Sequence, residues 1–315
     1  MKLQTLALDT SYRPGTYLFL ALICSWARYM IFYFMKPLNF IVAQLVLVFC
    51  VLLGSNAWAV PRVIGHNTQA FPLLGEELDV GVAIAPPFVI ADRGFNNLSG
   101  IDIELIYELQ RRTGFSFTED RIQLMNFGEL LDIGEEGQLD ITGGAISLTQ
   151  ERSSIFDLSE SSCLSDSVAV VRNGSNISNV YDLLGRTIAV EVGTTAEEVL
   201  PTEIAQGVKI KHSATNFMQF YDVARGDADV MIVDHAVAVD YIKTWPDANL
   251  KVAFTIPQSE GAIGLLFKKN PRVAKHLAQA FKEMKEDGTV DEIVNRYIPN
   301  YTAHSHKTTR LAQAK

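Results

Sequence analysis

Cysteine is the scarcest chemically reactive residue in this sequence of 315 residues. Of the three cysteines present, Cys24 and Cys50 lie in hydrophobic segments near the start, and Cys163 stands alone in the remainder. A disulfide framework in that remainder is therefore excluded. No histidine lies close to Cys163 in the sequence, so the pattern favours a structural thiol over a nucleophile.

Positive charge is also in deficit. There are 27 basic and 36 acidic residues, for a net charge of −9. The basic residues are scattered, without the stripe and interleaved aromatic residues that are typical of nucleic-acid-binding proteins. Hydrophobic residues make up 48% and charged residues 20%, which indicates an ordinary globular protein. We expect no nucleic-acid partner, no cofactor and no metal.

Long hydrophobic runs occur only in residues 16–53. The run Leu38–Leu53 has sixteen residues without charge, which is short for a membrane span of about 20 residues. It follows Lys36 and precedes Ala57 and Ala59, giving the basic start, apolar centre and small-residue exit of a secretory signal. These features predict export to the periplasm.

The predicted export signal gives the N-terminal part of the chain two segments. We predict a signal peptide over 35–59, cut before Val60, with residues 1–34 as an extension or upstream translation. The alternative is a membrane anchor, if residues 16–53 are not cleaved. At the other end, residues 299–315 are polar and without periodicity, which predicts a disordered tail.

Strand and helix patterns alternate from Leu78 onward, which predicts an α/β fold. Segments 78–84 and 186–192 are apolar runs typical of strands, and 100–114 has helical periodicity ending at Gly114. The order predicts parallel sheets with helices on both sides. We predict two lobes, each a sheet flanked by helices: lobe 1 from residues 60–170 plus 262–298, and lobe 2 from residues 171–261. The ligand cleft is expected between them.

Two segments of lobe 1 could line this cleft. Phe88 follows Pro86-Pro87 at the end of a predicted strand, where it could face a ligand or be an ordinary core residue. Thr149 is a plausible N-cap, which places Arg152 in the first turn of a helix. A cation is unfavourable there, so a carboxylate partner is indicated. The alternative is a salt bridge from Arg152 to a nearby acid such as Glu151 or Asp157.

Two segments of lobe 2 complete the candidate site. Gly193, Thr194 and Thr195 follow a strand and open a predicted helix, with Thr195 and Glu198 forming a capping box. Such a helix start can bind an anion, or it can be a purely structural cap. Asp234 ends an apolar strand, where it could bind an ammonium group or cap the next helix. A cation, an anion-binding turn and a carboxylate in one cleft suit a zwitterion.

The order of several short motifs resembles a known family. The motifs are PPF, GIDIELI, GQLDITGGAISLTQER, FDLS, GTTAEE, GDADVMIVD and KEDGTVDEIVNRY, between Leu78 and Ile298. They resemble the family 3 periplasmic solute-binding proteins of ABC importers, whose fold is the type II periplasmic binding protein fold, also found in the ligand-binding core of ionotropic glutamate receptors. The resemblance implies that Arg152 binds a ligand carboxylate and Asp234 its ammonium group. It places the other expected ligand-binding positions at Thr194, Thr195, Ser147, Ala145, Phe88 and Phe127.

The resemblance implies a monomeric receptor that captures an amino acid or a similar small zwitterion, without chemistry, for an inner-membrane ABC permease. An enzyme on the same scaffold, of the cyclohexadienyl dehydratase type, is the alternative and would need a general acid such as Glu160 or His235. A membrane-tethered sensory protein is a third possibility. Ala85 stands where the family often has an aromatic residue, and Ser161, Ser162 and Cys163 replace its usual aromatic pair, so the identity of the ligand stays open.

Overall fold

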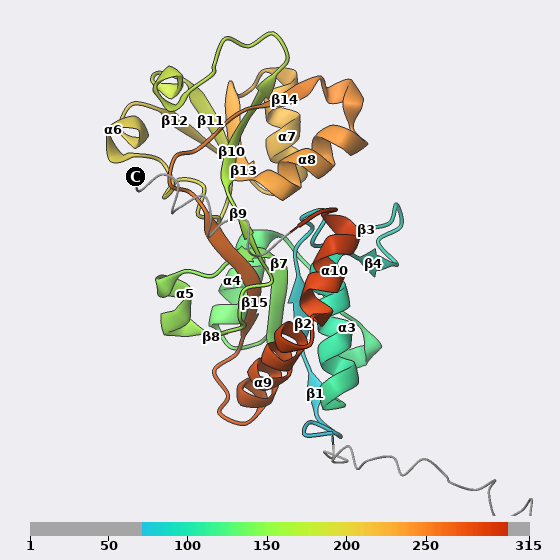
Figure 1. The fold of residues 1–315 in the computed structure, drawn as a ribbon. Helices are drawn as coiled ribbons and strands as arrows, with labels where there is room; N and C mark the ends of the chain where they lie inside the picture. Colours follow the sequence, from blue (N-terminus) through green and yellow to red (C-terminus); the bar gives the residue numbers. More distant parts are fainter. Residues whose placement is uncertain (1–70, 302–315) are drawn as a thin grey trace, which may run out of the picture. The chain divides into compact units, whose positions relative to one another are not determined.

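A computed structural model describes residues 71–301, which contain two large β-sheets, each with its own helices (Figure 1). Two small two-stranded sheets accompany them: β1 Glu77–Leu78 with β5 Ser116–Phe117, and β3 Ile90–Ala91 with β4 Leu98–Ser99. The predicted extension, signal peptide or anchor, and all but the first three residues of the predicted tail lie outside the described residues. Between residues 71 and 301, none of the helices has the length and apolar character needed to cross a membrane.

The first sheet has six strands in the order β6-β2-β7-β15-β8, with β9 also pairing with β15. Strands β2, β6 and β7 are parallel, whereas β15 is antiparallel to β7, β8 and β9. The sheet is therefore mixed, and the prediction of a parallel sheet was wrong for its second half. The reason is that β15 enters directly from the other sheet, without the crossover helix that a parallel strand needs. The strands are β2 Val80–Val82, β6 Gln123–Leu124, β7 Ile141–Ser147, β8 Asp157–Leu158, β9 Cys163–Ser165 and β15 Gly261–Phe267.

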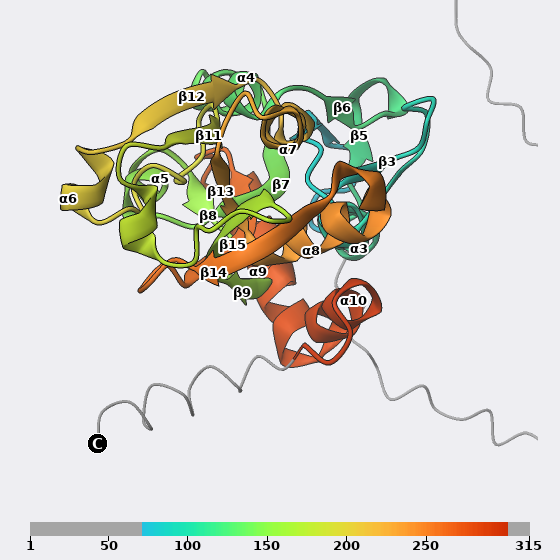
Figure 2. The same cartoon turned by 90° about the horizontal axis from the view of Figure 1, so that it is seen from above.

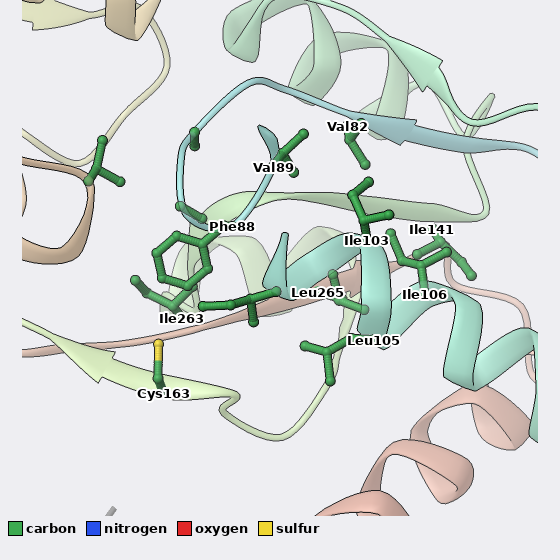
Figure 3. Close-up of a cluster of buried hydrophobic side chains, with 14 of the residues drawn as sticks. Val82, Phe88, Val89, Ile103, Leu105, Ile106, Ile141, Cys163, Ile263 and Leu265 are labelled. Atoms are coloured by element: carbon green, nitrogen blue, oxygen red, sulfur yellow. The ribbon is translucent and has the colours of Figure 1, made fainter. Parts of the chain in front are cut away.

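Helices cover both faces of the first sheet. On one face, α3 packs with α9 and α10, and on the other face α4 packs against β2 and β7. Successive side chains of a strand point to opposite faces of the sheet, so each face of β15 needs its own cover. Ile263 and Leu265 accordingly join the core under α3, while Leu266 joins the core under α4. Figure 3 shows the first of these cores, with side chains of α3 directed at β7 and β15. The helices are α3 Ile101–Thr113, α4 Phe127–Glu135, α9 Val273–Glu286 and α10 Thr289–Tyr297.

The second sheet has five strands in the order β12-β11-β13-β10-β14. Strands β11, β12 and β13 are parallel, and β10 is antiparallel to both β13 and β14. Helices α7 and α8 pack against this sheet. The elements are β10 Ser167–Arg172, β11 Thr187–Glu191, β12 Lys209–Ser213, β13 Val230–Asp234, β14 Leu250–Thr255, α7 Asn216–Arg225 and α8 His235–Thr244.

The chain passes between the two sheets twice. It leaves the first sheet between β9 and β10, at Asp166, and returns between β14 and β15, across residues 256–260. Figures 1 and 2 show these two connections side by side. The second sheet is thus inserted into the sequence of the first, which brings residues 143–152 and 191–195 to a common site. The predicted boundaries of lobe 1, at 60–170 plus 262–298, and of lobe 2, at 171–261, remain predictions.

Candidate functional site

One cavity collects polar side chains from both sheets. Its walls come from β7 and α5 (Gln150–Ile155) on the first-sheet side, and from β11, α7, β13 and α8 on the second-sheet side. Of the residues predicted to bind a ligand, all except Phe88 line it. The lining residues are Phe127, Gly144, Ala145, Ser147, Arg152, Ser167, Glu191, Thr194, Thr195, Ala196, Asn216, Gln219, Ile232, Val233, Asp234 and Val237. We call this the charged cavity.

Arg152 is held on the first-sheet side by its own helix cap. The Thr149 hydroxyl accepts a hydrogen bond of 3.1 Å from the backbone N–H of Arg152, which confirms the predicted N-cap. The guanidinium donates from Nη1 to the Ser147 carbonyl at 2.7 Å and from Nη2 to the Gly193 carbonyl at 3.0 Å. These bonds use two of its five N–H donors, so donors remain for a carboxylate.

No carboxylate forms an ion pair with Arg152 within residues 71–301. The alternative of a salt bridge to Glu151 or Asp157 is therefore not supported. The side chain is only 9% exposed, and this burial lowers the pKa of Arg152. Its guanidinium carbon lies 5.8 Å from the centre of the Phe127 ring, which orients it further. A buried cation without an acidic partner is suited to an incoming anion.

Asp234 is the acidic counterpart on the second-sheet side. It ends β13 and occupies the N-cap position of α8, yet its side chain makes no capping hydrogen bond. The alternative role as a helix cap is thus not supported. Burial raises the pKa of Asp234 to about 6, while a hydrogen bond from the Ser165 side chain and the charge of Arg152 act in the opposite direction. The carboxylate can accept an ammonium group.

The segment after β11 differs from its prediction. Residues 192–200 form turns, with the N–H of Glu198 bonded to the Thr195 carbonyl at 3.0 Å, and the only helix nearby is α6, Thr202–Ala205. The prediction of a helix beginning at Thr194 or Thr195, with its capping box, was wrong. Pro201 disfavours helical geometry in the residue before it, and this stops a helix from continuing. Anion binding by a helix start therefore does not apply here.

These turns lie against the first-sheet side of the site. The hydroxyls of Ser147 and Thr195 are 3.3 Å apart, and the Thr194 hydroxyl donates to the Glu191 carbonyl at 2.8 Å. A Cβ atom on Gly128 would lie 3.1 Å from Val192 Cγ1. Glycine at the start of α4 thus permits the close approach of Val192, the residue after β11.

A bend in β7 shapes the floor of this cavity. Gly144 and Ala145 have φ values of 136° and 57°, and the second is unusual for a residue with a side chain. The bend is held by Asp102 of α3, whose Oδ2 accepts bonds from the N–H groups of Gly144 at 2.8 Å and Ala145 at 3.0 Å. Asp102 is fully buried, and this burial raises its pKa to about 6. Asp102 was not among the predicted site residues.

Three polar residues of the second-sheet side were also missed. Gln219 donates from Nε2 to the carbonyls of Ala189 and Ile232, at 2.9 and 2.7 Å, and so bridges β11 and β13. Asn216 begins α7 and lines the cavity. Glu191 ends β11, is 3% exposed, and burial raises its pKa to about 8. An acid at the end of an apolar strand is the same signal that identified Asp234, and it could have identified Glu191.

The buried carboxyl of Glu191 leads to a prediction about stability. Up to a pH of about 8 it keeps its proton in the folded protein, whereas in the unfolded chain it ionises above its ordinary pKa of 4.5. The folded state then binds more protons, so its contribution to stability is lost as the pH rises toward 8. We expect the free energy of unfolding, measured with urea, to fall between pH 6 and 8. Glu191→Gln should flatten this slope, and an unchanged slope would contradict the assignment.

Other predicted residues lie outside the charged cavity. Phe88 is fully buried in the core with Ile263 and Cys163 (Figure 3), as its alternative role of a core residue describes. Glu160 and His235, the general acids considered for an enzyme, are exposed and do not line the cavity. Burial raises the pKa of the Cys163 thiol to about 12, which disfavours the thiolate that a nucleophile needs.

Comparison with known proteins assigns the family. The model of the bacterial extracellular solute-binding proteins, family 3, matches residues 78–300, which include both sheets and the charged cavity. The chain belongs to this family. Members of this family are extracytoplasmic solute-binding proteins. The resemblance found in the sequence is thus confirmed.

Named relatives of this family 3 protein are binding proteins. The amino-acid-binding protein AabA of Dichelobacter nodosus is 24% identical over 65% of this chain and 81% of its own length. The L-cystine-binding protein TcyJ of Escherichia coli (strain K12) is 25% identical over 76% of this chain and 92% of its own length. The arginine-binding extracellular protein ArtP of Bacillus subtilis (strain 168) is 24% identical over 64% and 79%, respectively.

Solved structures share the two-lobed fold of this family 3 protein. An ancestral arginine-binding protein bound to arginine superposes with a TM-score of 0.64 and 28% identity, over 70% of this chain and 97% of that one. The arginine-, lysine-, histidine-binding protein ArtJ of Geobacillus stearothermophilus gives a TM-score of 0.63 and 25% identity, over 71% and 96%. The predicted α/β fold with two lobes is thereby confirmed.

Proposed function

We propose that this family 3 solute-binding protein captures a free α-amino acid in the charged cavity. The observation that carries the proposal is that Arg152 of α5 and Asp234 of β13 line one cavity from its two sides, each without an ion-pair partner among residues 71–301. The guanidinium suits the α-carboxylate, and the carboxylate of Asp234 suits the α-ammonium group. Ser147, Thr194 and Thr195 add hydroxyl groups around the carboxylate.

The relatives support the same ligand class. Their names specify amino acids in general, L-cystine and arginine, and one ancestral structure is bound to glutamine. These ligands share the α-carboxylate and the α-ammonium group, and they differ in the side chain. The shared groups are the ones that Arg152 and Asp234 would bind, so the support concerns the amino acid and not its side chain.

The transport role follows from the same proposal. A ligand that contacts both sheets stabilises the closed arrangement of the lobes, and a closed receptor is what a membrane permease can distinguish from an open one. We propose that the protein acts as a monomer, exported to the periplasm by the segment 35–59, and delivers its ligand to an ABC permease. A membrane anchor formed by residues 16–53 would instead tether the receptor.

Thermal denaturation with the common α-amino acids tests this function. A ligand present at 100 times its dissociation constant stabilises the folded protein by about 2.7 kcal/mol, which raises the melting temperature measurably. We expect at least one α-amino acid to do so. The amine without the carboxylate and the hydroxy acid without the ammonium group are the matched controls, and both should shift the melt far less. If no α-amino acid raises the melting temperature, the proposed function is wrong.

A further inference from the structure

Glu191 lies at the junction of the charged cavity and a second cavity. The second cavity, here called the aromatic cavity, has walls that are mostly aromatic or aliphatic, and it shares Glu191 and Phe127 with the charged cavity. Its lining residues are Ala83, Ile84, Phe95, Leu124, Met125, Asn126, Phe127, Glu191, Thr215, Phe217 and Tyr241. An amino acid held by Arg152 and Asp234 would therefore have Glu191 beside the path of its side chain into the aromatic cavity.

The carboxyl of Glu191 is poorly satisfied for a buried group. It is 3% exposed, and its Oε2 has no hydrogen-bond partner among the described residues. The backbone N–H of Asn216, at the start of α7, provides a hydrogen bond that favours the charged form. No lysine or arginine within residues 71–301 forms an ion pair with it. A buried carboxyl with one oxygen unpaired and no cation beside it is costly, which is typical of a group kept for a ligand.

The charges around the site point to the missing partner. The charged cavity has one cation, Arg152, and two carboxyl groups, Asp234 and Glu191. The carboxylate and ammonium group of an α-amino acid would pair with Arg152 and Asp234, which leaves Glu191 for a second positive group. Phe127, Phe217 and Tyr241 could cover the methylene chain that carries this group and attract the cation through their ring faces.

We propose that Glu191 selects α-amino acids with a cationic side chain. This inference rests on the proposed function, because it needs the amino acid to be oriented by Arg152 and Asp234. A site with a buried carboxyl discriminates strongly against a neutral ligand of the same shape, because the neutral ligand leaves that carboxyl unpaired. Basic amino acids are accordingly the substrate class of this receptor.

Arginine and citrulline form the matched pair of ligands for a test. They have nearly the same size, and the guanidinium of arginine is replaced by a neutral urea group in citrulline. We expect isothermal titration calorimetry at pH 7.5 to show arginine binding tighter than citrulline by roughly 30-fold or more. Glu191→Gln should reduce this ratio to within about threefold, because the amide keeps the shape but cannot release a proton to form an ion pair with the bound cation.

A control variant separates local from general electrostatics. Glu203→Gln makes the same substitution at an exposed position on α6, outside both cavities, and should keep the wild-type ratio of arginine to citrulline affinity. Citrulline or glutamine binding as tightly as arginine would overturn the inference and leave the proposed function intact. A full arginine preference in Glu191→Gln would overturn the role of Glu191. If no α-amino acid binds the wild-type protein, the proposed function and this inference fail together.

Discussion

Arg152→Ala is expected to abolish amino-acid binding at the concentrations that saturate the wild-type protein. Removing one partner of a buried charged hydrogen bond costs about 2–5 kcal/mol, which corresponds to roughly 30-fold to several thousand-fold in affinity. Here the loss should be near the upper end, because Arg152 is 9% exposed and is the only cation lining the charged cavity. Isothermal titration calorimetry with the amino acid found by thermal denaturation measures this loss.

The matched variant is Arg152→Lys, which keeps the charge and loses the planar fork of donors. It should bind more weakly than wild type and more tightly than Arg152→Ala, because an ammonium group cannot donate in parallel to both carboxylate oxygens. The unliganded melting temperatures of both variants should be measured as well, since Arg152 also bonds to the carbonyls of Ser147 and Gly193. If Arg152→Ala binds as tightly as wild type, the carboxylate site has been misplaced.

Asp102→Ala is expected to cause the largest loss of stability among the variants considered. Its carboxylate accepts hydrogen bonds from the backbone N–H groups of the buried residues Gly144 and Ala145. Alanine at position 102 would leave both donors unpaired. Each unpaired buried donor costs about 1–3 kcal/mol, so we expect the free energy of unfolding to fall by about 2–4 kcal/mol. Urea unfolding at pH 7 measures the change.

Asp102→Asn is the control for this effect. It keeps one oxygen that can accept a hydrogen bond and retains the volume of the side chain, so its loss should be about half as large or less. Ligand affinity should also decrease in Asp102→Ala, because the bend at Gly144 and Ala145 lines the charged cavity. Equal stability of Asp102→Ala and wild type would show that the bend does not depend on this carboxylate.

The regular elements could be predicted because their sequence patterns are local. The helix over 100–114 has an apolar face and ends at Gly114, and α3 ends there, with Gly114 in the left-handed conformation at φ 85°. Arg152 and Asp234 stand out locally, as a charge beside a helix cap and at the end of an apolar strand, but their ligand roles were predicted from the family resemblance. Their location in one cavity followed from the predicted insertion of one lobe into the other.

The remaining features depend on contacts that no local pattern encodes. Asp102 looks like an ordinary acid in the first turn of a helix, and only the packing of α3 on β7 turns it toward Gly144. Gln219 lies on a helix with several polar residues, and the sequence does not show which of them faces β11 and β13. The turns after Gly193 were mistaken for a helix because the capping pattern was given more weight than Pro201.

Cys163 has a practical consequence for work on this receptor. It is the only cysteine within residues 71–301, it is 2% exposed, and burial raises its pKa to about 12. The thiolate is the form that attacks thiol reagents, so this side chain should react slowly with them at neutral pH. A new cysteine on the rim of the charged cavity could therefore carry a fluorescent dye while Cys163 stays in place. The native core would then serve, without alteration, as the frame of an optical sensor for the bound solute.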